Sequence, residues 1–285
     1  MKRLLLAATT VFSVAWAAQP AVTHAASAPI SFGLAPGNQK PPKYFFDYTV
    51  TPGQSLNDTV AVINPNNTPL TVKLSTSDAF TRLQGGGISF RDGSQQRAVG
   101  RWVHLQQTTA TVAPKHVLFV GLSLTVPASA KPGEYEGTIN ATNTQAQTII
   151  SGKIGFKIHG TVRCIVLLRV AGKAKADLRV TRVAVVRANQ QNYLGIGLLN
   201  AGTVFVLPAT TTVTLAGAST VTLHPTISTI LGGDATTIIV PLDQHLAPGT
   251  YRVRIQITYQ AHLEAGGQFL TMQRTWYWMA TVPTR

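Results

Sequence analysis

The most constraining feature of this sequence is a segment that occurs twice. "VPASAKPGEYEGTI" and "VPLDQHLAPGTYRVRI" both place Val-Pro, a short polar connection and Pro-Gly-x-Tyr before a run with alternating apolar residues. Proline pre-sets φ at the first central position of a type II turn, and glycine supplies the positive φ of the second. We therefore predict type II turns at Pro132 and Gly133 and at Pro248 and Gly249, each followed by a strand.

The tyrosine of each segment has a structural explanation. In immunoglobulin-like sandwiches a tyrosine at such a corner buries its ring and donates its hydroxyl to the backbone of the preceding connection. Tyr135 and Tyr251 are the candidates, although the cysteine that follows in antibody domains is replaced by Gly137 and Val253. The single cysteine, Cys164, cannot form an internal disulfide, so packed cores must stabilise the fold.

The remaining sequence predicts an all-β fold. Short Val/Ile/Thr/Leu runs alternate with Pro, Gly and Asn, and the segment 58–77, with "NPNN" at its centre, predicts a β-hairpin. An apolar strand ends in asparagine in each half, at Asn64 and at Asn200. A length of 285 residues suits two domains. Together with the repeat, it predicts two tandem immunoglobulin-like β-sandwiches.

The start of the chain predicts export. Lys2 and Arg3 precede the apolar run "LLLAATTVFSVAWAA", and small residues precede an expected cleavage near Ala25, so residues 1–25 are interpreted as a signal peptide. No later stretch is long and apolar enough to span a membrane, and we expect no transmembrane segment in the mature chain. The sandwiches are predicted at 29–158 and 162–285, with the join inside 158–176.

No catalytic, cofactor or metal site is predicted. The ten acidic residues form no pair suited to general acid and base work, and the seven histidines show no metal-ligand spacing. The glycine-rich "LQGGGISF" lacks the Gly-Lys-Ser/Thr end of a phosphate-binding loop, and we interpret it as a turn leading into a strand. We therefore expect a protein that is not an enzyme and needs no cofactor.

The charge of the chain indicates anionic partners. Its formal net charge is +14, although only 12% of its residues are charged. A positive surface favours wall polymers or anionic lipid head groups. A nucleic-acid partner is not expected, because the basic residues are dispersed and the chain has no recognisable binding motif.

One aromatic cluster is a candidate for protein binding. In "RTWYWMATV", Trp276 and Trp278 would share one face of a strand and Tyr277 the other. Such a strand is either covered on both faces or exposes one face to a partner.

An ordered set of segments resembles a known family. From Phe32 to Ala141 these are "SFGLAP", "YFFDYTVTPGQSLNDTVAVINPNNTPLTVKL", "SDAFTRLQGGGISF", "GRWVHLQQTTATVAPKHVLFVGLSLTVP" and "AKPGEYEGTI". Together they resemble the peptidoglycan-binding domain of WxL-interacting proteins, which are surface proteins of Gram-positive bacteria. "VRCIVLLRV", "LRVTRVAVV" and "YLGIGLLNAGT" resemble the family's second sandwich. The resemblance implies attachment to peptidoglycan through the first domain and binding of another surface protein through the second. The transmembrane helix and basic tail that typically end family members do not follow "ATVPTR".

Basic and aromatic side chains of the first domain are the candidates for binding wall polymer, through charge, stacking and hydrogen bonds. They are Lys40, Lys43, Tyr44, Arg82, Arg91, Arg97 and Arg101. The alternative function is that of a pilus-type periplasmic chaperone, which has two immunoglobulin-like domains and donates a β-strand to its client. Such chaperones also need a basic pair in the cleft between their domains, which the sequence does not reveal. A secreted hydrolase is a third class.

Overall fold

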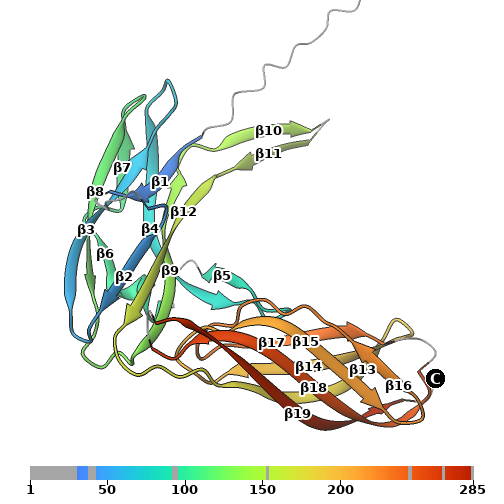
Figure 1. Cartoon of the computed structure of the whole chain (residues 1–285). Helices are drawn as coiled ribbons and strands as arrows, with labels where there is room; N and C mark the ends of the chain where they lie inside the picture. Colours follow the sequence, from blue (N-terminus) through green and yellow to red (C-terminus); the bar gives the residue numbers. More distant parts are fainter. Residues whose placement is uncertain are drawn as a thin grey trace, which may run out of the picture. The chain divides into compact units, whose positions relative to one another are not determined.

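The computed structural model describes residues 31–37, 43–91, 96–151, 154–242, 246–264 and 267–283. The predicted signal peptide and Lys40 lie outside these residues. The described chain consists of strands and one short helix, α1 (Val99–Trp102), and it forms two immunoglobulin-like β-sandwiches (Figure 1). The predicted all-β fold is confirmed. No helix in the described ranges is long and apolar enough to cross a membrane.

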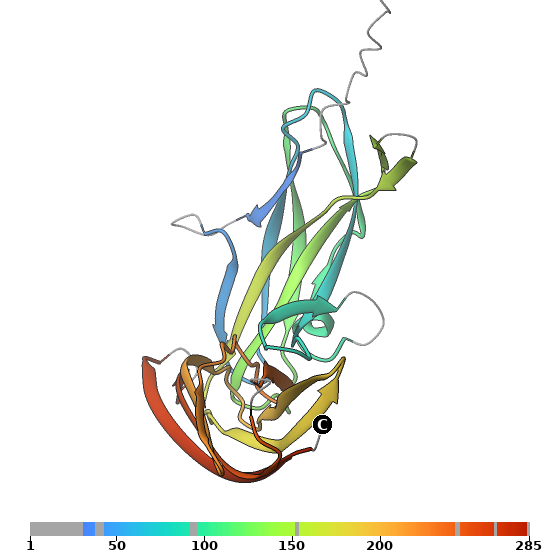
Figure 2. The same cartoon turned by 90° about the vertical axis from the view of Figure 1, so that its right-hand side faces the viewer.

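The first sandwich packs two sheets against each other (Figure 2). One has the order β1 (Gly33–Pro36), β3 (Ser55–Ile63), β8 (Val117–Thr125) and β6 (Val103–Leu105). The other has the order β2 (Phe46–Val50), β12 (Thr161–Val170), β9 (Gly133–Asn143), β4 (Leu70–Thr81) and β5 (Ile88–Arg91), with β7 (Thr109–Val112) also paired to β4. Alternate side chains of the two sheets, such as Val62, Leu74 and Leu168, are buried and form the core.

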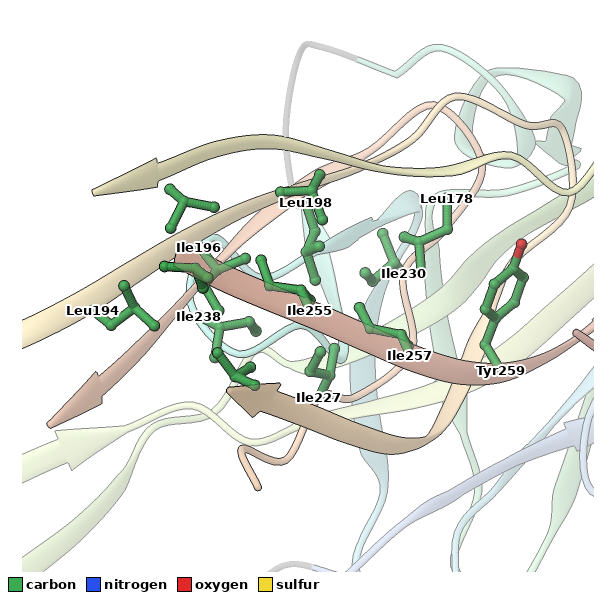
Figure 3. Close-up of a cluster of buried hydrophobic side chains, with 14 of the residues drawn as sticks. Leu178, Leu194, Ile196, Leu198, Ile227, Ile230, Ile238, Ile255, Ile257 and Tyr259 are labelled. Atoms are coloured by element: carbon green, nitrogen blue, oxygen red, sulfur yellow. The ribbon is translucent and has the colours of Figure 1, made fainter. Parts of the chain in front are cut away.

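The second sandwich has the same layered construction. Its sheets have the orders β13 (Leu178–Ala188), β14 (Gln191–Asn200), β17 (Ala235–Pro241), and β16 (Thr220–Leu223), β15 (Leu207–Ala216), β18 (Gly249–His262), β19 (Phe269–Val282). Figure 3 shows side chains from the two sheets, among them Leu194, Ile196 and Ile255, meeting in a continuous apolar cluster. Burial of these side chains stabilises the domain without a disulfide.

The predicted hairpin over residues 58–77 is wrong. β3 pairs with β1 and β8, whereas β4 pairs with β9, β5 and β7, so "NPNN" connects two different sheets. The buried Asn64 holds this crossing, because its side-chain amide donates to the backbone oxygens of Thr68, Val112 and Ala113 at 2.9 to 3.0 Å. Period-2 alternation identifies the strands but does not say which strands pair.

The second asparagine has the same role. The buried side chain of Asn200 donates to the backbone oxygens of Val204 and Ile230 at 2.8 and 3.0 Å, and it accepts from the backbone N–H of Gly202. Each asparagine satisfies backbone groups that a connection inside the sandwich would otherwise leave unpaired. The repeated Asn therefore marks equivalent positions of the two sandwiches.

The repeated tyrosines make the hydrogen bonds that a tyrosine corner predicts. The hydroxyl of Tyr135 donates to the Lys131 oxygen at 2.8 Å, and that of Tyr251 donates to the Ala247 oxygen at 2.9 Å. Both glycines have positive φ, but the values, 157° at Gly133 and 145° at Gly249, are far from the +80° of a type II turn. The type II prediction is therefore wrong, and each glycine is instead the first residue of its strand, β9 or β18.

The predicted boundary between the domains also needs correction. β12, which the boundary at 162 assigns to the second sandwich, pairs with β9 and β2 and completes a sheet of the first. Its even-numbered residues from Cys164 to Val170 are buried in the first core. Burial raises the pKa of the Cys164 thiol to about 11, which keeps it protonated. The first sandwich therefore ends after Val170.

Candidate functional site

A free strand edge is the main candidate for a binding site. The C-terminal half of β12, Val166–Val170, is paired with β9 on one side and with β2, in parallel, on the other. Over Thr161–Ile165, no described strand pairs with β12 on the side away from β9. An unpaired edge presents N–H and C=O groups that can accept a further strand. Tyr44, just before β2, lies beside this edge, with its backbone oxygen 3.7 Å from the Cys164 Sγ.

The edge continues into a hairpin beyond the sandwich. β10 (Gln147–Ser151) and β11 (Ile154–Ile158) form a two-stranded ribbon that extends β9 and β12, and Figures 1 and 2 show this ribbon projecting from the sheet. Within the described ranges, β10 is the only strand paired with β11. Phe156 and Ile158 are 51% and 45% exposed, and Ile165 on β12 is 44% exposed.

The pattern of apolar residues makes this edge unusual. From Cys164 onward every second residue of β12 is buried, and the same alternation runs back through Val162 to Ile158 and Phe156, whose side chains are about half exposed. Apolar residues at alternate positions are the pattern of a strand with one face in a core. Here part of that strand has no core of its own.

The one basic side chain of β12 close to the second domain is already paired. Arg169 forms an ion pair with Asp47 of β2, and it is close enough to Glu134 to lower the pKa of that carboxyl. Both members of the ion pair are largely shielded from solvent. A client carboxylate would therefore have to compete with Asp47 for this guanidinium. The basic pair that a pilus-type chaperone needs is not formed by Arg169.

A glycine-rich loop between β4 and β5 of the first sandwich contacts the second sandwich. Gly85, Gly86 and Gly87 all have positive φ, between 72° and 84°, and β5 follows directly, as the sequence predicts. The loop also pairs with the second domain, which sequence reasoning missed: the Gly87 N–H donates to the Thr229 oxygen at 2.8 Å, and the Ser228 N–H donates to the Gly85 oxygen at 2.9 Å. The signal was the run of three glycines, since close backbone approach needs residues without Cβ.

The first tyrosine corner forms a second contact. The backbone N–H of Glu134 donates to the Thr203 oxygen at 2.9 Å, and a Cβ at Gly133 would lie only 2.2 Å from that same oxygen. The buried Glu134 carboxylate also contacts the Nδ1 of His262, at the end of β18. Burial raises the pKa of Glu134, against the opposing effect of His262. The second corner has no such neighbour among the residues that the structure describes, none of which comes within 4 Å of a Cβ at Gly249.

A cavity of about 330 Å³ lies beside these contacts. Its lining includes the carboxylates of Asp78, Glu134, Glu136 and Asp234. Burial and the neighbouring Glu134 raise the pKa of Glu136 to about 7. Asp78 instead accepts hydrogen bonds at the start of α1, and Asp234 accepts one from the Thr81 N–H at 2.7 Å. The described residues contain no group of three His, Cys, Asp or Glu that could hold a metal ion.

The predicted wall-binding residues lie at two opposite edges of one sheet. At one edge Arg91 is the register partner of Asp78, whose carboxylate accepts from the backbone N–H of Arg97 close to Arg101. Arg82, near them in sequence, donates its Nε to the Gly86 oxygen at 3.0 Å. At the other edge are Lys43, which pairs with Asp47, and the 93% exposed Tyr44. The structure therefore gathers the arginines but separates them from Lys43 and Tyr44.

The aromatic candidates of the second domain lie on the two opposite faces of β19, as their spacing predicts. Trp276 and Trp278 are half-buried against the second core, and Tyr277 is 57% exposed on the opposite face. The Arg252 guanidinium lies 4.9 Å from the centre of the Tyr277 ring. Only Tyr277 of the three therefore remains available to a partner.

Comparison with known proteins gives structural neighbours only. No family model and no curated protein matches the chain. Similar solved structures include the YadV chaperone (TM-score 0.41, 11% identity, covering 86% of this chain and 99% of that one) and the class 5 fimbriae chaperone CfaA (0.42, 11%, 86% and 99%). Another is the SafB chaperone of Salmonella enterica, in complex with the SafA pilin (0.39, 11%, 87% and 98%). At TM-scores below 0.5, these likenesses do not decide what the chain does.

Proposed function

We propose that this protein is an exported, non-enzymatic binding protein that holds a protein partner by adding a strand of the partner to the free edge of β11 and β12. Pilus-type chaperones use this mode of binding. The observation that carries the proposal is the unpaired edge over Thr161–Ile165 and its continuation in β11. The second sandwich would hold the first in place through the glycine loop.

Strand addition uses both properties of this edge. Backbone N–H and C=O groups supply the affinity, and side chains at alternate positions supply the specificity. Phe156 and Ile158 on β11 are exposed at alternate positions. A partner whose core lacks a strand would bury these two side chains in that core. The added edge would complete the partner's sheet. The partner best suited to this edge is therefore a β-sandwich subunit that is missing a strand.

The ion pair between Arg169 and Asp47 sets this chain apart from the basic pair expected of a pilus chaperone. We therefore infer that the edge, rather than capture of a client carboxylate, provides most of the affinity. Removing Asp47 would then change partner binding little, whereas removing the exposed apolar side chains would abolish it.

Recovery of a partner tests the proposal. The tagged full chain, purified from the envelope of its host, should carry a companion in a 1:1 ratio, and Phe156→Ser with Ile158→Ser should lose it. The matched control is Phe119→Ser on β8, because Phe119 is 57% exposed and lies in the opposite sheet. In the complex, the amide hydrogens of Thr161–Ile165 should exchange more slowly than in the free chain. A companion that survives the double substitution, or protection confined to other strands, would contradict strand addition here.

A second candidate function is attachment to peptidoglycan or an anionic wall polymer through the first domain. The observation that favours it is the gathering of Arg91, Arg97 and Arg101 around one edge of the sheet. Arg97→Gln with Arg101→Gln should reduce sedimentation of the chain with isolated sacculi at low salt. Arg252→Gln with Arg274→Gln removes the same charge from the second domain as a control. Equal sedimentation of both variants would exclude a role for the arginine edge.

A further inference from the structure

The outer face of the sheet formed by β13, β14 and β17 departs from the usual pattern of a sheet that faces water. Such a face is normally polar. Here the register places Ala184, Gly195 and Ile239 side by side, and the next row holds Val186, Tyr193 and Pro241. Val186 and Ile239 are 56% and 47% exposed. Exposed apolar faces of this kind mark binding sites.

Two glycines make this face hollow. Gly195 and Gly197 lie on the central strand β14, between the side chains of β13 and β17. They form the floor of a hollow of about 430 Å³, which has Tyr193 toward one end and Arg182 toward the other. This volume falls within the range of small-ligand sites. A β-bulge between Val180 and Arg182 sets the register that directs Arg182 to this face.

The backbone of the hollow excludes an added strand. β14 is paired along its length, with β13 on one side and β17 on the other, so its N–H and C=O groups are already used. A ligand must therefore be held through apolar contacts and through the charge at the end of the hollow. This separates the hollow from the free edge of the first sandwich.

The charge of the sheet specifies the ligand further. β13 carries Arg179, Arg182 and Arg187, and the three strands contain no acidic residue. Arg179 is engaged by Asp177. Arg182 has no ion-pair partner among the described residues and lines the hollow itself. An apolar ligand with an anionic end complements this arrangement.

We propose that the hollow on β13, β14 and β17 binds a small anionic amphiphile, a free molecule with a short apolar chain and a carboxylate that pairs with Arg182. The apolar chain lies on Gly195 between Ala184 and Ile239. This site is independent of the free edge of β11 and β12.

Calorimetric titration of the full mature chain with decanoate tests the site. Decanoate should bind once per chain, and Gly195→Val should weaken binding at least tenfold by filling the floor. The fold should tolerate this change, because a Cβ at Gly195 meets nothing closer than the Ala184 oxygen at 3.6 Å. Ala184→Leu, which fills the hollow from its wall, should have the same effect. Thr275→Val on β19 is the control and should bind as the unmodified chain does.

A second comparison isolates the charge. Arg182→Gln should weaken binding of decanoate several-fold and leave binding of uncharged decanol unchanged. Three results would overturn the proposal: decanoate binding that Gly195→Val and Ala184→Leu leave intact, binding to anionic vesicles without binding to free decanoate, or a dimer of the chain that Gly195→Val dissociates. The last two would assign the face to a lipid surface or to a second copy.

Discussion

Substitution of Gly86 by alanine should loosen the connection between the two sandwiches. Gly86 has φ of +72°, and a Cβ there would lie 2.7 Å from the backbone oxygen of Ser228 and 3.2 Å from that of Thr229. The first effect is backbone strain, which costs about 1–2 kcal/mol for a residue with a Cβ in this region. The second is the contact itself, which can be relieved only if the loop at Ser228 moves away.

That movement has a calculable cost. It breaks the hydrogen bonds from Gly87 to Thr229 and from Ser228 to Gly85, at 2.8 and 2.9 Å, and each contributes about 1 kcal/mol. The expected loss for Gly86→Ala is therefore about 3–4 kcal/mol. Gly85→Ala is the matched control, since Gly85 has φ of +75° but no described neighbour lies within 4 Å of its Cβ. It should lose only the strain, about 1–2 kcal/mol.

Thermal unfolding of the two variants measures the difference. About 2 kcal/mol corresponds to roughly 4–8 °C in Tm for a chain of this size. Gly87→Ala is a useful third variant, because the atoms nearest to its Cβ belong to the flexible Arg82 side chain. It should lose the strain and at most the Arg82 hydrogen bond to Gly86, and so fall between Gly85→Ala and Gly86→Ala. Equal melting of Gly85→Ala and Gly86→Ala would refute the reasoning, because strain alone would then explain both.

Three further predictions concern stability. Tyr251→Phe removes the hydroxyl that donates to the Ala247 oxygen at 2.9 Å, and it should lower the free energy of unfolding by about 1 kcal/mol in urea titrations; an unchanged midpoint would show that this bond contributes nothing. Asn200→Ala leaves the backbone oxygen of Val204 and the N–H of Gly202 without their side-chain partner, whereas the Ile230 oxygen keeps the Val206 N–H, and the substitution should cost about 2 kcal/mol. A loss below 1 kcal/mol would mean that other groups satisfy the two orphaned atoms. The pKa of Glu136 is raised from its ordinary value of 4.5 to about 7, so its contribution to stability is complete below pH 4.5 and is lost as the pH rises to 7. Glu136→Gln should therefore raise the free energy of unfolding at pH 8, by an amount on the order of 3 kcal/mol, and change it little at pH 4. The same gain at both pH values would contradict the titration.

Much of the fold could be predicted because local chemistry determines it. Period-2 alternation identifies strands, and the repeated Pro-Gly-x-Tyr segments identify the corners with Tyr135 and Tyr251. The pairing of β3 and β4 could not be predicted this way. The chain crosses from one sheet to the other at Asn64. The hydrogen bonds that stabilise this crossing are made with Val112 and Ala113, which are far away in the sequence.

The candidate sites were harder to predict for a related reason. A free edge is defined by which strands fail to pair, and β12 has the same alternation whether or not a neighbour covers it. The glycines of "LQGGGISF" could be recognised as a turn, but their contacts with Ser228 and Thr229 depend on a loop roughly 140 positions away. The hollow at Gly195 was missed because small residues on an outer face look like an ordinary apolar strand.

The two corners carry the same sequence motif under different constraints. At Gly133 the Thr203 oxygen occupies the space that any side chain would need, whereas no atom of the described residues lies within 4 Å of a Cβ at Gly249. If the two sandwiches arose by duplication, one copy of the motif has since become part of a joint and the other has remained a simple turn. Both glycines have a positive φ that disfavours any other residue, but only the first also faces a backbone oxygen. Mutational drift should therefore be slow at both glycines and slowest at the first.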